Sequence, residues 1–322
     1  MQLSIRIKPL IVVLLMSLLA GCTHGPTLKR HEYSQILMGV EVRIIAYAPD
    51  EATSYVAVKA AYERVADLEN CMSDYMPASE LMQLSARAGT GPVPVSDDLF
   101  RVLAYAQNIS KASNGTFDVT VGPLVQLWRT ARKTKTLPAG PALADARSRV
   151  GWELMKLDDK PKDDKPKTVE LTIHGMRLDL GGIAKGYAGD EVISVLEQYG
   201  IKSALFEAGG DIVVSAPPPG KRGWAVDTAH PNNTTRRIIW IKHSAVSTSG
   251  DTVQFVEIDG VRYSHVVDPR TGLGLTNQYL ATVRARRGIT TDALSTAATV
   301  LGPRDGKRLV KRFAATAFIR KS

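Results

Sequence analysis

The segment from Arg177 to Val192 constrains the fold and function of this chain more than any other. A short apolar strand is predicted to end at the glycine pair Gly181–Gly182, and a helix is predicted directly after it. The N-terminus of a helix has unpaired N–H groups and a partial positive charge, and Lys185 adds a full charge beside it. The segment therefore either binds a phosphorylated ligand or is a tight strand-to-helix turn with a solvated lysine.

Two familiar phosphate-binding patterns are absent from the sequence. Gly181, Gly182 and Gly186 do not have the G-x-G-x-x-G spacing of a dinucleotide fingerprint. The pattern G-x-x-x-x-G-K-[ST] of the phosphate loop does not occur either. A phosphorylated ligand is therefore expected without either of these two motifs.

The first 22 residues indicate export and lipid attachment. An apolar run over 10–20 follows Arg6 and Lys8, and it is too short for an ordinary membrane-spanning helix. Leu-Ala-Gly-Cys at 19–22 is similar to the lipobox of bacterial lipoproteins, so residues 1–21 are expected to be a signal peptide and Cys22 the lipidated (palmitate-bearing) N-terminus. The alternative is an uncleaved anchor or an ordinary signal peptide. We expect a periplasmic protein held on a membrane by its lipid, with the inner membrane favoured.

Charge and cysteine content narrow the classes of ligand. The formal net charge is +9, which favours anionic lipid headgroups or phosphorylated ligands. Nucleic acid is a poor candidate because the basic residues are dispersed and only 6% of the residues are aromatic. Cys71 is the only cysteine besides Cys22, and the six histidines are scattered, so the sequence supports neither a disulfide nor a zinc or iron–sulfur site.

Apolar periodicity predicts an α+β chain in which helices dominate the first third and strands dominate the rest. Residues 158–167 form a charged, proline-containing segment, which we expect to be a solvated loop between two strands. Helices are expected at 52–70, 97–113, 139–150 and 183–198 and from Asp292 onward, and strands at 40–47, 168–173, 176–180, 203–206, 211–215, 224–228 and 236–241.

Three oxygen-bearing side chains share one face of the last predicted helix. Asp292, Ser295 and Thr296 are spaced i, i+3 and i+4. A carboxylate and hydroxyls are hard ligands of the kind that Mg²⁺ takes, together with water and substrate phosphate. The alternative is that Thr291 or Asp292 caps the helix while Thr296 packs in the core. The helix therefore carries either part of a magnesium site or an ordinary cap.

Four further clusters combine polar side chains with turns. The segment 264–272 brings His265, Asp268 and Arg270 together, which suits acid–base work or ligand binding, although Arg270 could equally be a surface charge. Each of the other three clusters can also be read as a simple helix stop or turn. They are an aromatic and a carboxylate beside a glycine turn at 113–118, two acids around a Gly-Gly bend at 207–211, and a hydroxyl-rich turn at 247–251.

The segment 177–192, the clusters at 113–118, 207–211 and 264–272, and the residues 292–296 occur in an order that resembles the FAD:protein FMN transferase family, also called ApbE. The resemblance covers nearly the whole chain after Cys22 and implies an α+β fold of mixed sheets with flanking helices and an active site between two lobes. It assigns residues 22–33 to a tether and 34–322 to the transferase domain. The matching blocks are Met38-Gly39, Met72–Tyr75, Gly115–Asp118, Gly122–Leu124, Asp179–Gly186, Glu207–Asp211, Ser264–Pro269 and Asp292–Thr296.

The resemblance implies a Mg²⁺-dependent enzyme that splits FAD, attaches FMN through a phosphoester to a threonine or serine of a target protein, and releases AMP. Acceptors in the family include flavin-bearing subunits of Na⁺-translocating NADH:quinone reductase and of Rnf complexes. Hydrolysis of FAD to FMN and AMP is one alternative, because water could replace the target hydroxyl. A lipoprotein that only binds flavin is the other.

The resemblance also assigns site residues. His265 or a nearby carboxylate such as Asp268 would accept the hydroxyl proton. Val40 and Asp74 depart from the family pattern, and an asparagine expected near Ser85 is missing. The implied FAD contacts are Met38, Tyr75, Thr116, Phe117, Asp118, Asp179, Lys185 and Val267, and the implied Mg²⁺ ligands are the Gly182 carbonyl, Asp292 and Thr296, with Ser295 where some members carry aspartate.

Overall fold

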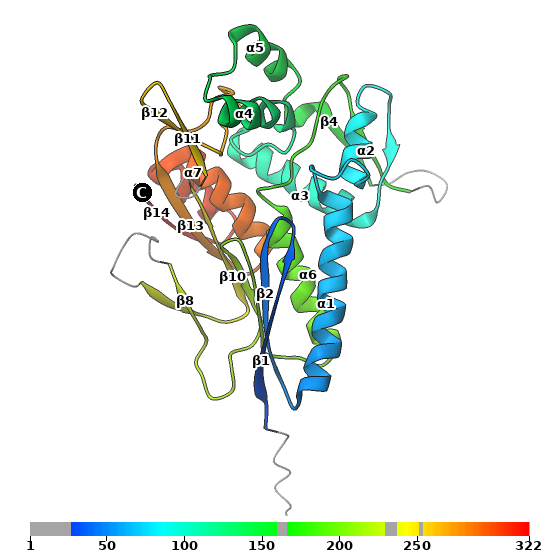
Figure 1. Cartoon of the computed structure of the whole chain (residues 1–322), viewed down its shortest axis with the longest axis vertical. Coiled ribbons are helices and arrows are strands. Elements are labelled where there is room, and N and C mark those ends of the chain that lie inside the picture. Colours follow the sequence, from blue (N-terminus) through cyan, green and yellow to red (C-terminus); the bar gives the residue numbers. More distant parts are fainter. Residues whose placement is uncertain (1–26, 160–165, 229–236, 251–253, 322) are drawn as a thin grey trace, which may run out of the picture.

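A computed structural model describes residues 27–159, 166–228, 237–250 and 254–321. Its largest element is a seven-stranded sheet whose neighbouring strands all run antiparallel (Figure 1). The signal peptide and Cys22 lie outside the described residues. In spatial order, the strands are β1 (Lys29–Leu37), β2 (Val40–Ala48), β6 (Ala204–Ala208), β7 (Asp211–Val214), β10 (Ser244–Ser249), β13 (Tyr279–Ala285) and β14 (Thr316–Lys321).

Three helices cover one face of this sheet and bury the main core against it. They are α1 (Glu51–Met72), α6 (Ala184–Gln198) and α7 (Gly288–Lys311). The other face packs against a two-stranded sheet of β8 (Trp224–Asp227) and β9 (Ile238–Ile241) through a smaller apolar cluster. Burial on both faces explains why β6 and β7 are almost continuously apolar rather than alternating.

A second group of elements lies at one end of the sheet, at the top of Figure 1. The turn of the β1–β2 hairpin points toward this group, whereas the start of β1 points away from it. The site described below is built where the group meets the sheet and its helices. Its members are α2 (Glu80–Ala86), α3 (Asp97–Ser113), α4 (Gly122–Thr134), α5 (Gly140–Ser148), a three-stranded sheet of β3 (Val93–Pro94), β5 (Thr168–Leu171) and β4 (Met155–Asp158), and the hairpin of β11 (Phe255–Ile258) and β12 (Val261–Ser264).

Local capping explains the helix boundaries in the first third of the chain. The side chains of Asp50, Ser79 and Ser96 each accept a backbone N–H at the start of α1, α2 and α3. Asn114 adopts the left-handed conformation that ends α3. The helix predicted at 97–113 is therefore confirmed at both ends.

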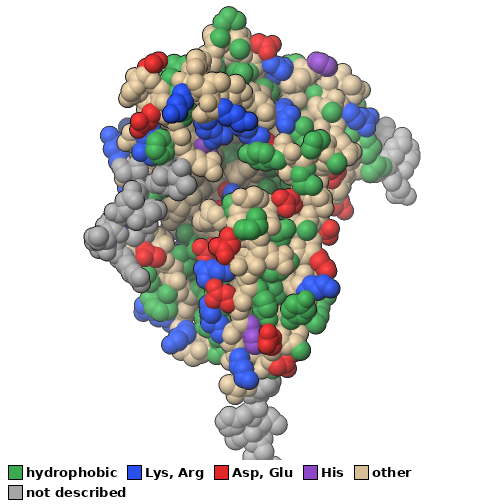
Figure 2. Space-filling view, viewed as in Figure 1, with side chains coloured by type: hydrophobic (Ala, Val, Ile, Leu, Met, Phe, Trp, Pro, Cys, Tyr) green, Lys and Arg blue, Asp and Glu red, His purple; other side chains and the backbone are tan. Residues whose placement is uncertain are grey.

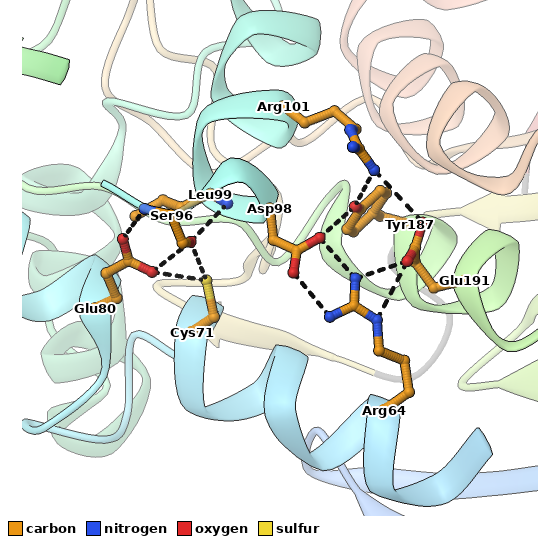
Figure 3. A network of polar contacts seen from close by, with 9 residues as sticks. All are labelled: Arg64, Cys71, Glu80, Ser96, Asp98, Leu99, Arg101, Tyr187 and Glu191. Atoms are coloured by element: carbon orange, nitrogen blue, oxygen red, sulfur yellow. Dashed lines mark hydrogen bonds and ion pairs between the residues drawn. The ribbon is translucent and has the colours of Figure 1, made fainter. Parts of the chain in front are cut away.

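A polar network ties α1, α3 and α6 together (Figure 3). Arg64 of α1 forms ion pairs of 2.6 Å with Asp98 of α3 and with Glu191 of α6. Tyr187 donates its hydroxyl proton to Asp98 and accepts a hydrogen bond from Arg101. These contacts hold α6 in place, and the N-terminal turn of α6 carries Lys185.

Most of the other expected elements are confirmed, but α2 and α4 were not predicted. The last helix begins at Gly288 rather than near Asp292, with Arg287 at the N-cap position, so neither Thr291 nor Asp292 caps it.

Two further differences concern strands. The strand predicted at 176–180 is wrong, because this segment is irregular and forms only one isolated parallel bridge, between Arg177 and Val121. Strand β1 begins at Lys29, inside the residues assigned to the tether. Because β1 contains several charged side chains, its sequence looks like a polar linker. In the structure it pairs with β2 along its whole length. No helix in the described ranges combines the length and apolar character needed to cross a membrane.

Candidate active site

The site begins where the first turns of α6 and α7 touch. A Cβ added to Gly186 would lie 2.2 Å from the carbonyl oxygen of Gly288, and a Cβ on Gly288 would lie 2.2 Å from that of Gly186. The two backbones are therefore in direct contact, which only glycine permits. The sequence suggested that the glycines of this segment admit a phosphate, but Gly186 serves helix packing instead.

Asp292 lies at this contact on α7. Its carboxylate accepts a hydrogen bond of 3.0 Å from the backbone N–H of Gly186, so it occupies one of the unpaired donors at the start of α6. Burial raises the pKa of Asp292 to about 7, the negative charge of Asp211 adds to the increase, and Lys185 opposes it. Burial makes the ionised form of Asp292 unfavourable, and a bound cation would stabilise that form.

Lys185 is the cation that the structure itself places beside these carboxylates. Its Nζ lies 3.2 Å from Asp211 and donates to the carbonyl of Gly181 at 3.1 Å. Burial acts to lower the pKa of Lys185, but the carboxylates of Asp292 and Asp211 outweigh it and raise the pKa above the usual value. Lys185 therefore stays charged and is fixed by its partners, rather than being the solvated lysine of the alternative interpretation.

Thr296 lies one turn after Asp292 and faces the glycine turn that precedes α6. A Cβ on Gly182 would lie 2.9 Å from Thr296 Oγ1 and 3.4 Å from the Phe117 ring. Three sequence blocks far apart in the chain thus meet at Gly182. Ser295, in contrast, is 1% exposed and donates its hydroxyl to the backbone carbonyl of Asp292.

The residues on either side of Phe117 point into the protein. Thr116 is 1% exposed and donates to the carbonyl of Ser113. Asp118 accepts hydrogen bonds from the backbone N–H and the hydroxyl of Thr120. Burial raises the pKa of Asp118 to about 6, while these hydrogen bonds act to lower it. Thr116 and Asp118 thus shape the turn that carries Phe117, whose ring is itself buried, with 4% of the residue exposed.

Asp118→Asn is expected to flatten the pH dependence of stability. Below pH about 4 the carboxyl is protonated in both the folded and the unfolded chain, and above pH about 6 it is ionised in both. Burial of the ionised carboxylate destabilises the folded state. The free energy of unfolding therefore falls by up to about 3 kcal/mol as pH rises from about 4 to about 6. Urea unfolding at several pH values measures this slope. The exposed Asp67→Asn is the control, and an Asp118→Asn slope equal to that of the wild type would contradict the expectation.

Asp179 joins the glycine turn to a residue that the sequence analysis did not identify. Its Oδ1 accepts a hydrogen bond of 2.8 Å from the N–H of Gly181, and its Oδ2 lies 3.5 Å from Arg129 of α4. Arg129 also lies over the ring of Tyr75 and pairs with Asp74. No sequence signal marked Arg129, because its partners lie about 50 residues away on either side.

The β1–β2 turn reaches the same place from the sheet. Met38 and Gly39 both have positive φ, as a tight two-residue hairpin requires. A Cβ on Gly209, in the β6–β7 turn, would lie 3.3 Å from Val40 and 3.6 Å from Lys185. Met38 is therefore carried to the region of Lys185 by two adjacent hairpin turns.

The loop after β12 holds the remaining predicted residues. Val267 is buried in a cluster with Leu124 and Trp128 of α4 and their neighbours. Asp268 accepts three hydrogen bonds from the backbone and side chain of Arg270, so its described partner lies within its own turn. His265 Nδ1 lies 3.0 Å from the carbonyl of Gln254. A carbonyl oxygen can only accept, so Nδ1 carries a proton in this contact, and Nε2 is the basic nitrogen whenever the ring is neutral.

A hollow between the two groups of elements is visible in Figure 2, with Lys and Arg side chains along its upper rim and Asp and Glu side chains on its lower rim. A separate groove of about 460 Å³ lies between α2, α4, α5 and the segment 175–177. None of the predicted site residues lines that groove. Among the described residues, no group of three or more His, Cys, Asp or Glu side chains could hold a metal.

The fold and the site together define an α+β protein in which Lys185, the carboxylates of Asp211 and Asp292 and the glycine turn before α6 meet at the junction of α6 and α7. A family model described as "ApbE family" matches residues 38–319. The chain belongs to the ApbE family.

Individual relatives agree with this assignment. The FAD:protein FMN transferase of Treponema pallidum is 28% identical over 316 residues, covering 94% of this chain and 87% of the relative. The FAD:protein FMN transferase of Haemophilus influenzae is 31% identical over 244 residues, covering 73% of this chain and 70% of the relative. Among solved structures, the apo form of the flavinyl transferase ApbE of Pseudomonas stutzeri superimposes with a TM-score of 0.80 at 27% identity, covering 92% of both chains. The structure of the flavin transferase ApbE of Vibrio cholerae superimposes with a TM-score of 0.81 at 28% identity, covering 91% of this chain and 93% of that structure.

Proposed function

We propose that this protein is an FAD:protein FMN transferase that uses Mg²⁺ to move FMN from FAD to a serine or threonine of another protein, releasing AMP. The observation that carries the proposal is the meeting of Lys185, Asp292, Thr296 and Gly182 where α6 and α7 begin. Relatives that span most of this chain bear the same enzyme name.

The residues at this meeting point fit a magnesium ion. Asp292 offers a carboxylate, Thr296 a hydroxyl and Gly182 a backbone carbonyl, and these are hard oxygen ligands. One carboxylate leaves positions open for water and substrate phosphate, as Mg²⁺ sites usually do. Ser295 fits less well, because its side chain turns back to the Asp292 carbonyl of its own helix and only 1% of the residue is exposed. When bound, the ion would polarise the phosphoryl oxygens and neutralise charge on them.

The chain's own residues can support an in-line displacement at the FMN phosphate. The acceptor hydroxyl oxygen forms a bond to phosphorus while the bond from phosphorus to the bridging oxygen breaks, and the electron pair leaves with AMP. Lys185 is positioned to neutralise charge that develops on the leaving phosphate. His265 is the proposed acceptor of the hydroxyl proton through Nε2, and Asp268 orders the loop that carries it.

Release of AMP from FAD tests this function. The purified protein is incubated with FAD and with either Mg²⁺ or EDTA, with and without a flavin-accepting subunit of a Na⁺-translocating NADH:quinone reductase or Rnf complex. The proposal predicts AMP that requires both Mg²⁺ and the acceptor. AMP without acceptor would instead favour an FAD pyrophosphatase, and bound FAD without AMP would leave a flavin-binding lipoprotein.

The proposed location is the periplasmic face of the envelope, with the lipid on Cys22 as the membrane anchor. Replacement Cys22→Ser should remove the acyl chains and move the protein from the membrane to the soluble fraction, because a protein without a second anchor dissociates readily. Fractionation of cells that express each form measures this shift. A wild-type protein whose intact mass shows no acyl chains on Cys22 would contradict the lipid anchor.

A further inference from the structure

Arg129 of α4 connects three separate parts of the chain. Its Nη2 lies 2.6 Å from Asp74 Oδ2 and 3.5 Å from Asp179 Oδ2. Its guanidinium carbon lies 4.1 Å from the centre of the Tyr75 ring. One planar cation therefore links the segment after α1, the turn before α6 and helix α4.

Tyr75 is held on one side and open on the other. The residue is 74% exposed, although Arg129, with 19% of its side chain exposed, lies against its ring. A guanidinium stacked on a tyrosine fixes the plane of the ring, because both groups are flat and the cation is attracted to the ring face. The free face of Tyr75 is thus presented as a platform on which another flat ring could stack.

Arg129 also offsets two neighbouring negative charges. Asp74 is 9% exposed in its side chain and Asp179 13%. Burial raises the pKa of Asp74, the charge of Asp179 adds to the increase, and Arg129 opposes both. Without Arg129, only the weaker effect of Arg177 on Asp74 and the interaction of Lys185 with Asp179 would offset these two carboxylates, and the excess negative charge beside the Gly181–Gly182 turn would repel an anionic ligand.

We propose that Arg129 is a positioning residue for the flavin substrate: it holds Tyr75 as a stacking platform and offsets the charges of Asp74 and Asp179 beside the Gly181–Gly182 turn. This inference rests on the proposed function, because it takes FAD as the ligand of the site. The residue need not touch the reacting phosphate. Its loss should therefore weaken FAD binding more than it slows the chemical step.

Arg129→Met tests the proposal, with Lys133→Met as the control. Both variants remove one positive charge from α4, but Lys133 is exposed. FAD affinity is measured from the change in flavin fluorescence on binding, and turnover is measured in parallel. We expect Arg129→Met to raise the Kd and KM for FAD about tenfold, with kcat within about twofold of wild type. Lys133→Met should leave all three unchanged. Arg129→Lys, which keeps the charge but loses the flat fork, should recover part of the affinity.

Tyr75→Leu alone keeps the proposal testable if Arg129→Met folds poorly, and two double variants test it further. Tyr75→Leu should weaken FAD binding to a similar extent. In the double variant with Tyr75→Leu, Arg129→Met should weaken FAD binding less than it does in the wild type, because the stacking platform is already lost. Asp74→Asn combined with Arg129→Met should regain part of the affinity, because one unbalanced charge is removed.

Three results would decide against the inference. They are an unchanged FAD affinity in Arg129→Met, a loss of kcat at constant KM, and full additivity with Tyr75→Leu. A wild-type protein that binds FAD but transfers no FMN would refute the proposed function alone, since the affinity measurements would still test the role of Arg129.

Discussion

Asp292→Asn is expected to lower the rate of FMN transfer about 10³-fold, because it removes the one carboxylate of the proposed magnesium site. The amide keeps the shape of the side chain and an oxygen that can accept the Gly186 N–H. The fold should therefore survive, and the loss should lie in metal-dependent turnover.

The same change should not destabilise the metal-free protein above pH about 7. The pKa of Asp292 is raised to about 7 in the folded chain, so above that pH the folded state bears the cost of a buried negative charge. An asparagine removes this cost. Below the unfolded pKa the carboxyl is protonated in both states, and the two proteins should be equally stable there.

The measurement is AMP release over a range of Mg²⁺ concentrations, together with thermal unfolding in EDTA. Asp305→Asn is the matched control, since it makes the same chemical change at an exposed ion pair with Arg308, in the part of α7 that follows the kink at Gly302. Asp292→Asn with wild-type turnover would remove this residue from the metal site. A fall in both turnover and stability would point to a purely structural role.

Gly186→Ala is expected to have the largest effect on stability. The new methyl group would be built 2.2 Å from the carbonyl oxygen of Gly288 and 2.7 Å from Cβ of Asp292. Two helix backbones must then separate, which costs about 3 kcal/mol or more. Because the start of α7 would move, Asp292 would lose its bond to the Gly186 N–H, and FMN transfer should fall with stability.

Gly140→Ala is the control for this substitution. Gly140 begins α5, and a Cβ there meets no atom within 4 Å, so alanine should be neutral or slightly stabilising. Urea unfolding of both variants measures the difference. A Gly186→Ala protein as stable as Gly140→Ala would show that α6 and α7 do not touch through their backbones.

The sequence predicted elements well where local chemistry marks them. Residues 97–113 form α3 as expected, because Ser96 and Asn114 provide caps that can be recognised from sequence. Residues 176–180 read as a strand because three of the five, Met176, Leu178 and Leu180, are apolar, yet these side chains are buried by packing rather than by sheet pairing. Apolar content alone does not distinguish these two kinds of burial.

The residues of the site also fall into those that the sequence predicted and those that it did not. The helical spacing of Asp292 and Thr296 was visible in the sequence, and the structure places both beside the glycine turn. Arg129 was not predicted, because its contacts with Asp74 and Asp179 depend on how α4 packs. The role of Gly186 was also not predictable, since a glycine required by a phosphate and one required by a neighbouring backbone look alike in sequence.

The most direct test of the central claim is the intact mass of an acceptor subunit after incubation with this protein, FAD and Mg²⁺, analysed under denaturing conditions. We expect the acceptor to gain the mass of one FMN less water, on a serine or threonine, and EDTA or Asp292→Asn to prevent the gain. An acceptor that keeps its original mass while the wild-type protein consumes FAD would contradict flavin transfer and favour simple hydrolysis.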